Sequence, residues 1–259
     1  MSDTEHRTTS RILDILELIA GKPEGLGLAD IARVLDAPKS SLHPLLVTLV
    51  ARNYLKLNGI SQKYQIGEEL FILGNRFVNS VELIDDIRVV TNLLSKNTSE
   101  TIYFGILSGL DVLYLIKSDY YSNFRVISNP GNKLPAYSTG YGKALLSQFS
   151  AEEIRSFYPD GTLQPVTENT LKDVESLNRE LEKIRQTGFA YEKEESTLGI
   201  QCIAAPVKWN SKIIAGISIA VPRFRYTNDR EEQFKHYLRE SVENIELLIQ
   251  KKHDQWNYS

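Results

Sequence analysis

The chain has one cysteine, few histidines and no long apolar run, and each scarcity excludes a class of protein. A single cysteine, Cys202, allows no internal disulfide and predicts a reducing compartment. Four histidines spread along the chain favour neither a metal site nor a cofactor. The longest nearly continuous apolar run, residues 213–221, is about half the length of a membrane span and predicts a buried strand. Because the N-terminus is polar and fits no leader, we expect a cytoplasmic protein without a membrane partner.

Length and composition are those of an ordinary globular protein. At 259 residues the chain exceeds the usual size of one domain and predicts two. Hydrophobic residues make up 42% and charged residues 24%, which excludes a disordered or low-complexity chain. The net charge of −3 argues, at face value, against a nucleic-acid partner.

The charge is unevenly distributed, however. Between Pro38 and Gly67 there is no Asp or Glu, whereas acidic residues cluster downstream, as at residues 192–195. The acid-free segment contains four basic residues, Lys39, Arg52, Lys56 and Lys63. These residues form a local cationic segment that could contact nucleic acid, or they form a solvated surface that happens to be basic. The elements that carry the charges decide between these two interpretations.

The same part of the chain has the pattern of a helix-turn-helix. Apolar residues at helical spacing predict helices over residues 12–19 and 28–35, followed by a tight turn. Pro38 suits the first position of a third helix, because its missing amide would be unpaired there. The buried stripe of this third helix comprises Leu42, Leu45, Leu46 and Leu49.

A hairpin follows the third helix and completes a winged helix-turn-helix. Residues 54–57 and 63–66 alternate apolar with polar on either side of Asn58 and Gly59. We expect the third helix to enter the major groove of double-stranded DNA and the wing to contact phosphates. The predicted DNA-binding residues are Lys39, Ser40, Ser41 and His43 on the helix, Arg52 after it, and Lys56 and Lys63 in the wing. A winged-helix module that binds protein is the alternative.

The rest of the chain predicts a linker helix and an α+β domain, so that the fold class is mixed α/β. Predicted boundaries are 5–67 for the winged helix-turn-helix, 68–82 for the linker helix and 83–255 for the second domain. The apolar stripe Leu70, Gly74, Phe77 and Val81 offers the linker a self-association surface. Helices are expected near 84–94, 141–149, 171–187 and 229–251, and strands near 101–107, 113–117, 201–207 and 212–221.

Two segments of the second domain partly match catalytic motifs, but neither match is complete. Residues 216–220 resemble a nucleophile elbow around Ser218, but the strand continues where a sharp turn is needed. Residues 140–143 resemble part of a phosphate loop, but Tyr137 and Ala144 stand at required Gly and Ser or Thr positions. We therefore predict no catalytic residue, although an enzyme with a winged-helix accessory domain remains the runner-up.

A binding site is better supported than a catalytic one. Gly140 and Gly142 open a predicted helix, whose free backbone amides suit a carboxylate. Cys202 and Ser218 lie on predicted apolar strands and could complete such a site. Alternatively, the glycines only permit close helix packing, and Cys202 and Ser218 are core residues.

With these elements in place, nearly the whole chain resembles the IclR-type bacterial transcriptional regulators. In the N-terminal half the resemblance rests on RILDILEL at 11–18, LADIA at 28–32, PKSSLH at 38–43 and YQIG at 64–67. In the C-terminal half it rests on LPA at 134–136, GYGKALL at 140–146, IRQTGFA at 184–190 and GIQCIAAPV at 199–207.

The resemblance implies a homo-oligomeric regulator, dimer or tetramer, with a GAF-like domain that binds a small organic acid or aromatic effector. The implied effector-binding positions are Gly140, Tyr141, Glu192, Cys202, Ser218 and Ala220. Tyr141 and Ala220 replace a small residue and a serine of members that bind small keto acids, which makes such a ligand less expected. Pro44 stands where the family usually has an arginine, so one basic DNA contact is missing, and Arg52 and Lys56 are expected to supply the positive charge. Because proline has no amide to donate, a kink in the third helix is also expected. Repressor and activator stay equally open.

Overall fold

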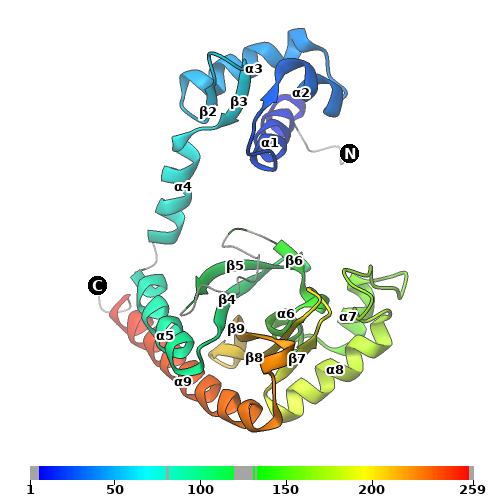
Figure 1. Ribbon diagram of the computed structural model, residues 1–259, viewed down its shortest axis with the longest axis vertical. Coiled ribbons are helices and arrows are strands. Elements are labelled where there is room, and N and C mark those ends of the chain that lie inside the picture. Colours follow the sequence, from blue (N-terminus) through cyan, green and yellow to red (C-terminus); the bar gives the residue numbers. More distant parts are fainter. Residues whose placement is uncertain (1–5, 80–81, 120–130, 132, 257–259) are drawn as a thin grey trace. The chain divides into compact units, whose positions relative to one another are not determined.

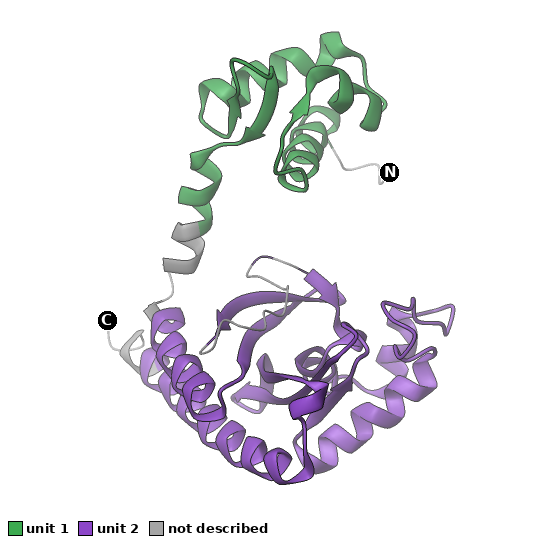
Figure 2. Cartoon of the chain, in the orientation of Figure 1, with its two compact units in different colours: residues 1–81 green, residues 82–259 purple. Residues whose placement is uncertain are grey.

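The computed structural model describes residues 6–79, 82–119, 131 and 133–256 and divides the chain into two compact units, residues 1–81 and 82–259 (Figures 1 and 2). The elements of the first unit are α1 (Arg7–Ala20), β1 (Leu26–Gly27), α2 (Leu28–Val34), α3 (Lys39–Ala51), β2 (Leu55–Leu57), β3 (Lys63–Ile66) and α4 (Glu68–Asn79). Three helices and a small antiparallel sheet, in the order β1-β3-β2, form the expected winged helix-turn-helix.

The core of the first unit follows the periodicity of the sequence. One face of each of α1, α2 and α3 is buried against Leu55 and Tyr64 of the sheet. The fully or nearly fully buried helical residues are Ile15, Ile19, Ile31, Leu42, Leu46 and Leu49. Because these side chains recur every three to four residues, the opposite face of α3 is left in solvent.

Three local features of this unit differ from expectation. Pro38 precedes α3 with an extended ψ of 136°, rather than starting it, and its carbonyl accepts the amides of Ser41 and Leu42. The hairpin loop spans residues 58–62, where the Asn58 side chain accepts two loop amides at 3.0 Å, so Asn58 and Gly59 do not form a two-residue turn. Strand β1 was not predicted, because two residues are too few to show a period.

Helices α3 and α4 each bear on an expectation from the sequence. Pro44 lies inside α3, and the helix continues through it to Ala51. On α4, Leu70 is half-buried and Gly74 is exposed within its unit, while Val81 and the Phe77 side chain lie outside the described residues.

The second unit is an α+β domain with one six-stranded antiparallel sheet, ordered β6-β5-β4-β9-β8-β7. Helices α5 and α9 pack together on one face, and α6 packs on the other, with α8 outside it (Figure 1). Its elements are α5 (Glu82–Thr98), β4 (Thr101–Ser108), β5 (Asp111–Ser118), β6 (Lys133–Pro135), the 3-10 turn η1 (Ala136–Ser138), α6 (Gly140–Leu146), α7 (Ala151–Phe157), α8 (Val174–Thr187), β7 (Ala190–Lys193), β8 (Ile200–Trp209), β9 (Lys212–Pro222), the 3-10 turn η2 (Arg223–Arg225) and α9 (Asn228–Trp256).

The α+β fold class is confirmed, and the additional elements are short. The predicted hairpin of residues 101–117 is β4 and β5, and the long strands β8 and β9 lie where alternation and apolar runs predicted them. Strands β6 and β7 and helix α7 were not predicted. Strand β7 matters for the site, because it brings Glu192 opposite Cys202 of β8.

Candidate nucleic-acid interface and effector cavity

The solvent-facing side of α3 carries a row of small and polar side chains near its N-terminus. Lys39, Ser40 and His43 are exposed, and Val47, one turn beyond, is 51% exposed. Pro44 is exposed in the same row. A helix that presents exposed side chains at this spacing has the form needed to enter a DNA groove.

Ser41 lies apart from this row. Its side chain is half-buried, its hydroxyl donates to the Pro38 carbonyl at 2.8 Å, and Arg11 Nη1 donates to it at 3.4 Å. Ser41 thus ties the start of α3 to α1 and is engaged within the protein, unlike Ser40.

Arg7 and Arg11 of α1 are not among the predicted DNA-binding residues, yet they lie beside the start of α3. Both line a groove with Pro38, Ser41 and Leu45 at the N-terminal ends of α1 and α3. The two arginines are four residues apart, so they share one side of α1, next to Pro38, Ser41 and Leu45. Their spacing and the absence of acid in the first turn were the available signals.

The wing residues differ in how free their charges are. Lys56 pairs with Gln65 across the hairpin, and Lys63 shares the Gln65 face two residues away. Lys56 Nζ lies 3.4 Å from Glu68 of α4, but both side chains are about 60% exposed, so this ion pair is weak. Arg52 directly follows α3 and is exposed, and its guanidinium carbon lies 6.0 Å from the centre of the Tyr54 ring.

A small cavity in the second unit brings together five of the six expected effector positions. Gly140 and Tyr141 contribute from α6, Cys202 from β8, and Ser218 and Ala220 from β9. Its volume is about 20 Å³, enough for about one water molecule. Other lining residues, which sequence reasoning missed, are Tyr103, Tyr114, Thr139, Ser196, Thr197 and Ile200.

Tyr141 fills much of this region of the fold. Its side chain is 2% exposed, and its ring meets Tyr114 edge to face at 5.3 Å between centres. The ring lies over paired glycines of β4 and β9: a Cβ at Gly105 would come within 2.9 Å of Tyr141 Cε2, and one at Gly216 within 3.0 Å of Tyr141 Cβ. Burial, and after it the nearby Tyr114, raises the pKa of the Tyr141 phenol, which is therefore neutral near pH 7.

The glycines that open α6 serve close packing. A Cβ at Gly140 would lie 3.3 Å from the Cβ of Cys202 and 3.6 Å from that of Glu192. The Gly142 amide, which was expected to be free for a carboxylate, donates to Thr139 Oγ1 at 3.1 Å. The start of α6 thus offers an anion fewer free amides than its sequence suggests.

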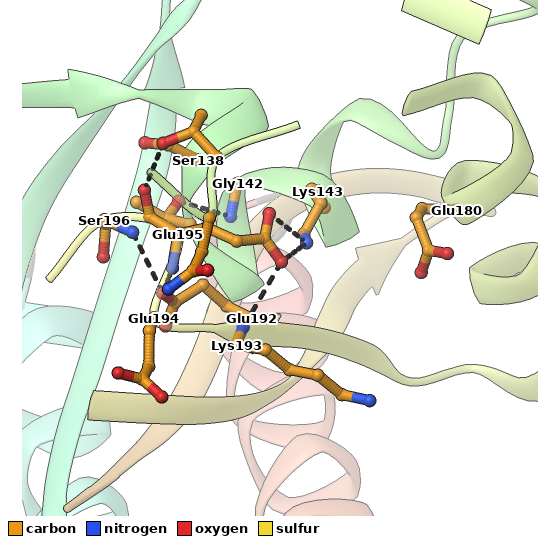
Figure 3. A network of polar contacts seen from close by, with 12 residues as sticks. Ser138, Gly142, Lys143, Glu180, Glu192, Lys193, Glu194, Glu195 and Ser196 are labelled. Atoms are coloured by element: carbon orange, nitrogen blue, oxygen red, sulfur yellow. Dashed lines mark hydrogen bonds and ion pairs between the residues drawn. The ribbon is translucent and has the colours of Figure 1, made fainter. Parts of the chain in front are cut away.

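Glu192 does not line the cavity but anchors the segment that does. Its Oε1 accepts the amides of Glu195 at 2.5 Å and of Ser196 at 3.0 Å (Figure 3). Its Oε2 is buried and has no hydrogen-bond partner. Burial raises the pKa of this carboxyl, against the opposing effects of the Ser196 amide and Cys202.

A buried ion pair holds the same segment from the other side. Lys143 Nζ of α6 donates to Glu195 Oε1 at 2.6 Å and Oε2 at 2.8 Å, with side-chain exposures of 1% and 9% (Figure 3). The hydroxyls of Thr167 and Thr170 donate to the Glu194 and Glu195 carbonyls. Nothing in the sequence pairs residues 143 and 195, which are 52 positions apart.

The thiol of Cys202 is one of the groups that line the cavity. Burial raises the pKa of the Cys202 thiol, and Glu192 raises it further, which makes it a poor nucleophile. Among the described residues there is no group of His, Cys, Asp and Glu that could hold a metal ion. No described helix is long and apolar enough to cross a membrane.

Comparisons with known proteins agree with both units. The model of the IclR helix-turn-helix domain matches residues 8–59, and that of the bacterial transcriptional regulator IclR C-terminal domain matches residues 75–247. The chain is 35% identical to the HTH-type transcriptional regulator BhcR of Paracoccus denitrificans, over 86% of this chain and 80% of that protein. It is 29% identical to the HTH-type transcriptional regulator KdgR of Escherichia coli K12, over 94% of both chains.

Solved structures show the same fold over more than nine-tenths of the chain. The Thermotoga maritima IclR structure has a TM-score of 0.75 at 26% identity and covers 93% of this chain and 97% of that one. An IclR homologue from Microbacterium hydrocarbonoxydans, complexed with 4-hydroxybenzoate, has a TM-score of 0.83 at 21% identity and covers 94% and 99%. The chain therefore belongs to the IclR family of bacterial transcriptional regulators, which bind DNA and are not enzymes.

Proposed function

We propose that this regulator binds its operator through α3 and the wing, and that a small organic acid or aromatic metabolite in the cavity of the second unit changes the affinity. The exposed row of α3, in a segment without acidic residues, carries this proposal. Ser40 and His43 are assigned to base edges, and Lys39, Arg52, Lys56 and Lys63 to phosphates. Ser41 is assigned to positioning the helix through Arg11.

Each part of the chain is assigned one role in this function. DNA binding is assigned to residues 5–67, connection to residues 68–82 and effector binding to residues 83–255. Because one winged helix contacts only a short half-site, we expect at least a dimer on a palindromic operator. The exposed apolar side chains of α4, among them Phe71 at 71% exposure, are compatible with self-association.

The effector assignment rests on the cavity. The expected positions that line it are Gly140, Tyr141, Cys202, Ser218 and Ala220. The segment of residues 195–200, part of which lines the cavity, is called the roof, and Glu192 is assigned to holding this roof through the Ser196 amide. The 4-hydroxybenzoate complex of the Microbacterium protein supports a small-molecule ligand for this fold, although that protein shares only 21% identity with this chain. The ligand shifts operator binding only by its differential affinity for the DNA-competent arrangement of the chain.

Footprinting on the DNA upstream of its own gene tests the DNA-binding part. We expect protection of two symmetric half-sites, and a changed sequence preference in Ser40→Ala but not in Ser156→Ala, an exposed serine of the second unit. Protection of one asymmetric half-site by monomers would reject the dimer.

Calorimetric titration with small acids and aromatic compounds tests the effector part. Cys202→Val and Ser218→Ala nearly preserve volume, and each lost hydrogen bond to the ligand is expected to cost roughly 1 to 3 kcal/mol of affinity. Operator binding in the absence of ligand controls for folding. Unchanged ligand affinity in both variants would place the ligand elsewhere.

A further inference from the structure

The tip of the wing, which is the loop of residues 58–62, presents an apolar side chain to solvent. Ile60 is 99% exposed, whereas the next most exposed large apolar residue of the described chain, Phe224, is 74% exposed. A Cβ at the neighbouring Gly59 would meet no atom within 4 Å, so the tip stands clear of the described parts of the chain. An isoleucine exposed in this way leaves its apolar surface in water and adds no burial to the fold.

The loop that carries Ile60 is held in shape by its own side chains. Asn58 Oδ1 accepts the amides of Ile60 and Ser61 at 3.0 Å. Gln62 Nε2 donates to a carbonyl of the same loop at 2.8 Å, and the Asn58 amide donates to the Lys63 carbonyl at 2.9 Å. Because Asn58 and Gln62 bond within the loop, the tip presents the side chains of Ile60 and Ser61. A β-branched side chain has few rotamers, so fixing Ile60 in a complex costs little conformational entropy.

The strands behind the tip carry positive charge and no acid. Lys56 and Lys63 lie on the same face of the hairpin as Gln65, and residues 39–66 contain no Asp or Glu. The tip begins two residues after Lys56, which is about 7 Å along a strand. With the two lysines at phosphates, as proposed above, the tip reaches past these phosphates and into the groove that they border.

The shape of the tip suits the minor groove of DNA. A two-stranded ribbon fits the major groove, which is about 12 Å wide, whereas the minor groove is only about 6 Å wide and admits single side chains. The major groove is assigned to α3, which leaves the neighbouring minor groove to the wing. Isoleucine has no donor or acceptor for a base edge, but an apolar side chain in the minor groove can wedge between base pairs and partly unstack them.

We propose that Ile60 enters the minor groove of the operator and wedges against a base-pair step, so that the wing senses how easily the DNA deforms. This proposal rests on the proposed function, because it adds a contact to the same DNA interface. Pyrimidine–purine steps such as TA and CA are the easiest to unstack. The operator is therefore expected to prefer such a step under each wing, at a position that α3 does not contact.

Ile60→Ser tests the wedge in the full chain, on the operator fragment found by footprinting. The variant removes most of the apolar surface and should weaken operator binding about tenfold. The slope of log affinity against log salt should stay unchanged, because no phosphate contact is lost. Ile60→Leu keeps the apolar surface and should bind within about threefold of the wild type. Val166→Ser, an exposed β-branched change in a loop of the second unit, is the matched control and should have no effect.

A change in the DNA provides the second readout. Replacing the pyrimidine–purine step under the wing with a stiff AA step should weaken binding of the wild type several-fold and binding of Ile60→Ser very little. An equal penalty in both proteins, or wild-type affinity of Ile60→Ser for the operator, would overturn the proposal while DNA binding through α3 stands. A protein partner would then be the better assignment for the tip. If the wild-type chain binds no duplex at all, the DNA-binding part of the proposed function fails, and this proposal fails with it.

Discussion

Lys143 and Glu195 form a buried ion pair that joins helix α6 to the roof of the cavity in the second unit, with Nζ 2.6 and 2.8 Å from the two carboxylate oxygens. Both side chains are almost completely removed from solvent. Because such a pair is favourable only while both partners are present, it links the shape of the cavity to the position of α6.

Glu195→Gln should therefore destabilise the second unit by about 3 to 5 kcal/mol, because it leaves the Lys143 ammonium buried without a counter-charge. Changing both residues, as Lys143→Met with Glu195→Met, should recover most of the loss. Urea unfolding followed by circular dichroism measures the effect. The control is Glu175→Gln, which breaks an exposed pair with Arg155 and should cost far less. Equal costs for the two single changes would show that burial of the pair is unimportant.

Stability should depend on pH through Glu192. Burial raises the pKa of its carboxyl in the folded protein, so the stabilisation from its proton is complete below the unfolded-state pKa of about 4.3 and is lost as pH rises through the folded-state pKa. Glu192→Gln stays neutral and should be more stable than the wild type near pH 8, with a difference that vanishes toward pH 4. Urea unfolding across this range measures it. A difference that grows toward acid pH would contradict the sign.

The wing is expected to contact the DNA backbone. Lys63→Ala and Lys56→Ala should each weaken binding to all sequences alike and reduce the slope of log affinity against log salt by about 0.9. Glu68→Gln should strengthen binding, because Glu68 is the ion-pair partner of Lys56. Lys212→Ala, an exposed change in the second unit, is the control. A slope that is untouched by both wing changes would mean that the wing lies away from the phosphates.

Pro44 lies on the exposed row of α3 and has no amide to donate to the Ser40 carbonyl. Pro44→Ala should restore that hydrogen bond and stabilise the first unit by as much as about 3 kcal/mol. Pro44→Arg should in addition steepen the salt dependence of DNA binding by about one unit relative to Pro44→Ala. Thermal unfolding and binding at several salt concentrations measure the two effects. Identical slopes for the alanine and arginine variants would place position 44 away from the phosphates.

The winged helix could be predicted because its signals are local. The stripe from Leu42 to Leu49 and the alternation around the wing repeat over several residues, so their periods are visible in the sequence. Strand β1 has two residues and β6 has three, which is too short for any period. Pro38 suits a position just before a helix as well as its first position, and only the observed ψ distinguishes them.

The cavity was predictable only in part, for a different reason. Five lining positions were recognised through the family resemblance, but the Tyr103 and Tyr114 walls and the Ser196 roof depend on strand register. Likewise, the pairing of Lys143 with Glu195 joins distant segments through the tertiary fold. The sequence does not show whether a charged side chain near a site is available to a ligand. Lys143 follows the cavity-lining Tyr141 by two residues, yet its ammonium is paired with Glu195.

We expect effector binding and operator binding to be coupled, and the coupling can be measured in both directions. The affinity for the operator is determined with and without a saturating ligand of the cavity, and the affinity for that ligand with and without operator DNA. Linkage requires the two ratios to be equal, and we expect a factor of about 5 to 150. A factor of one in both directions, with both ligands bound, would show that the two sites are not coupled.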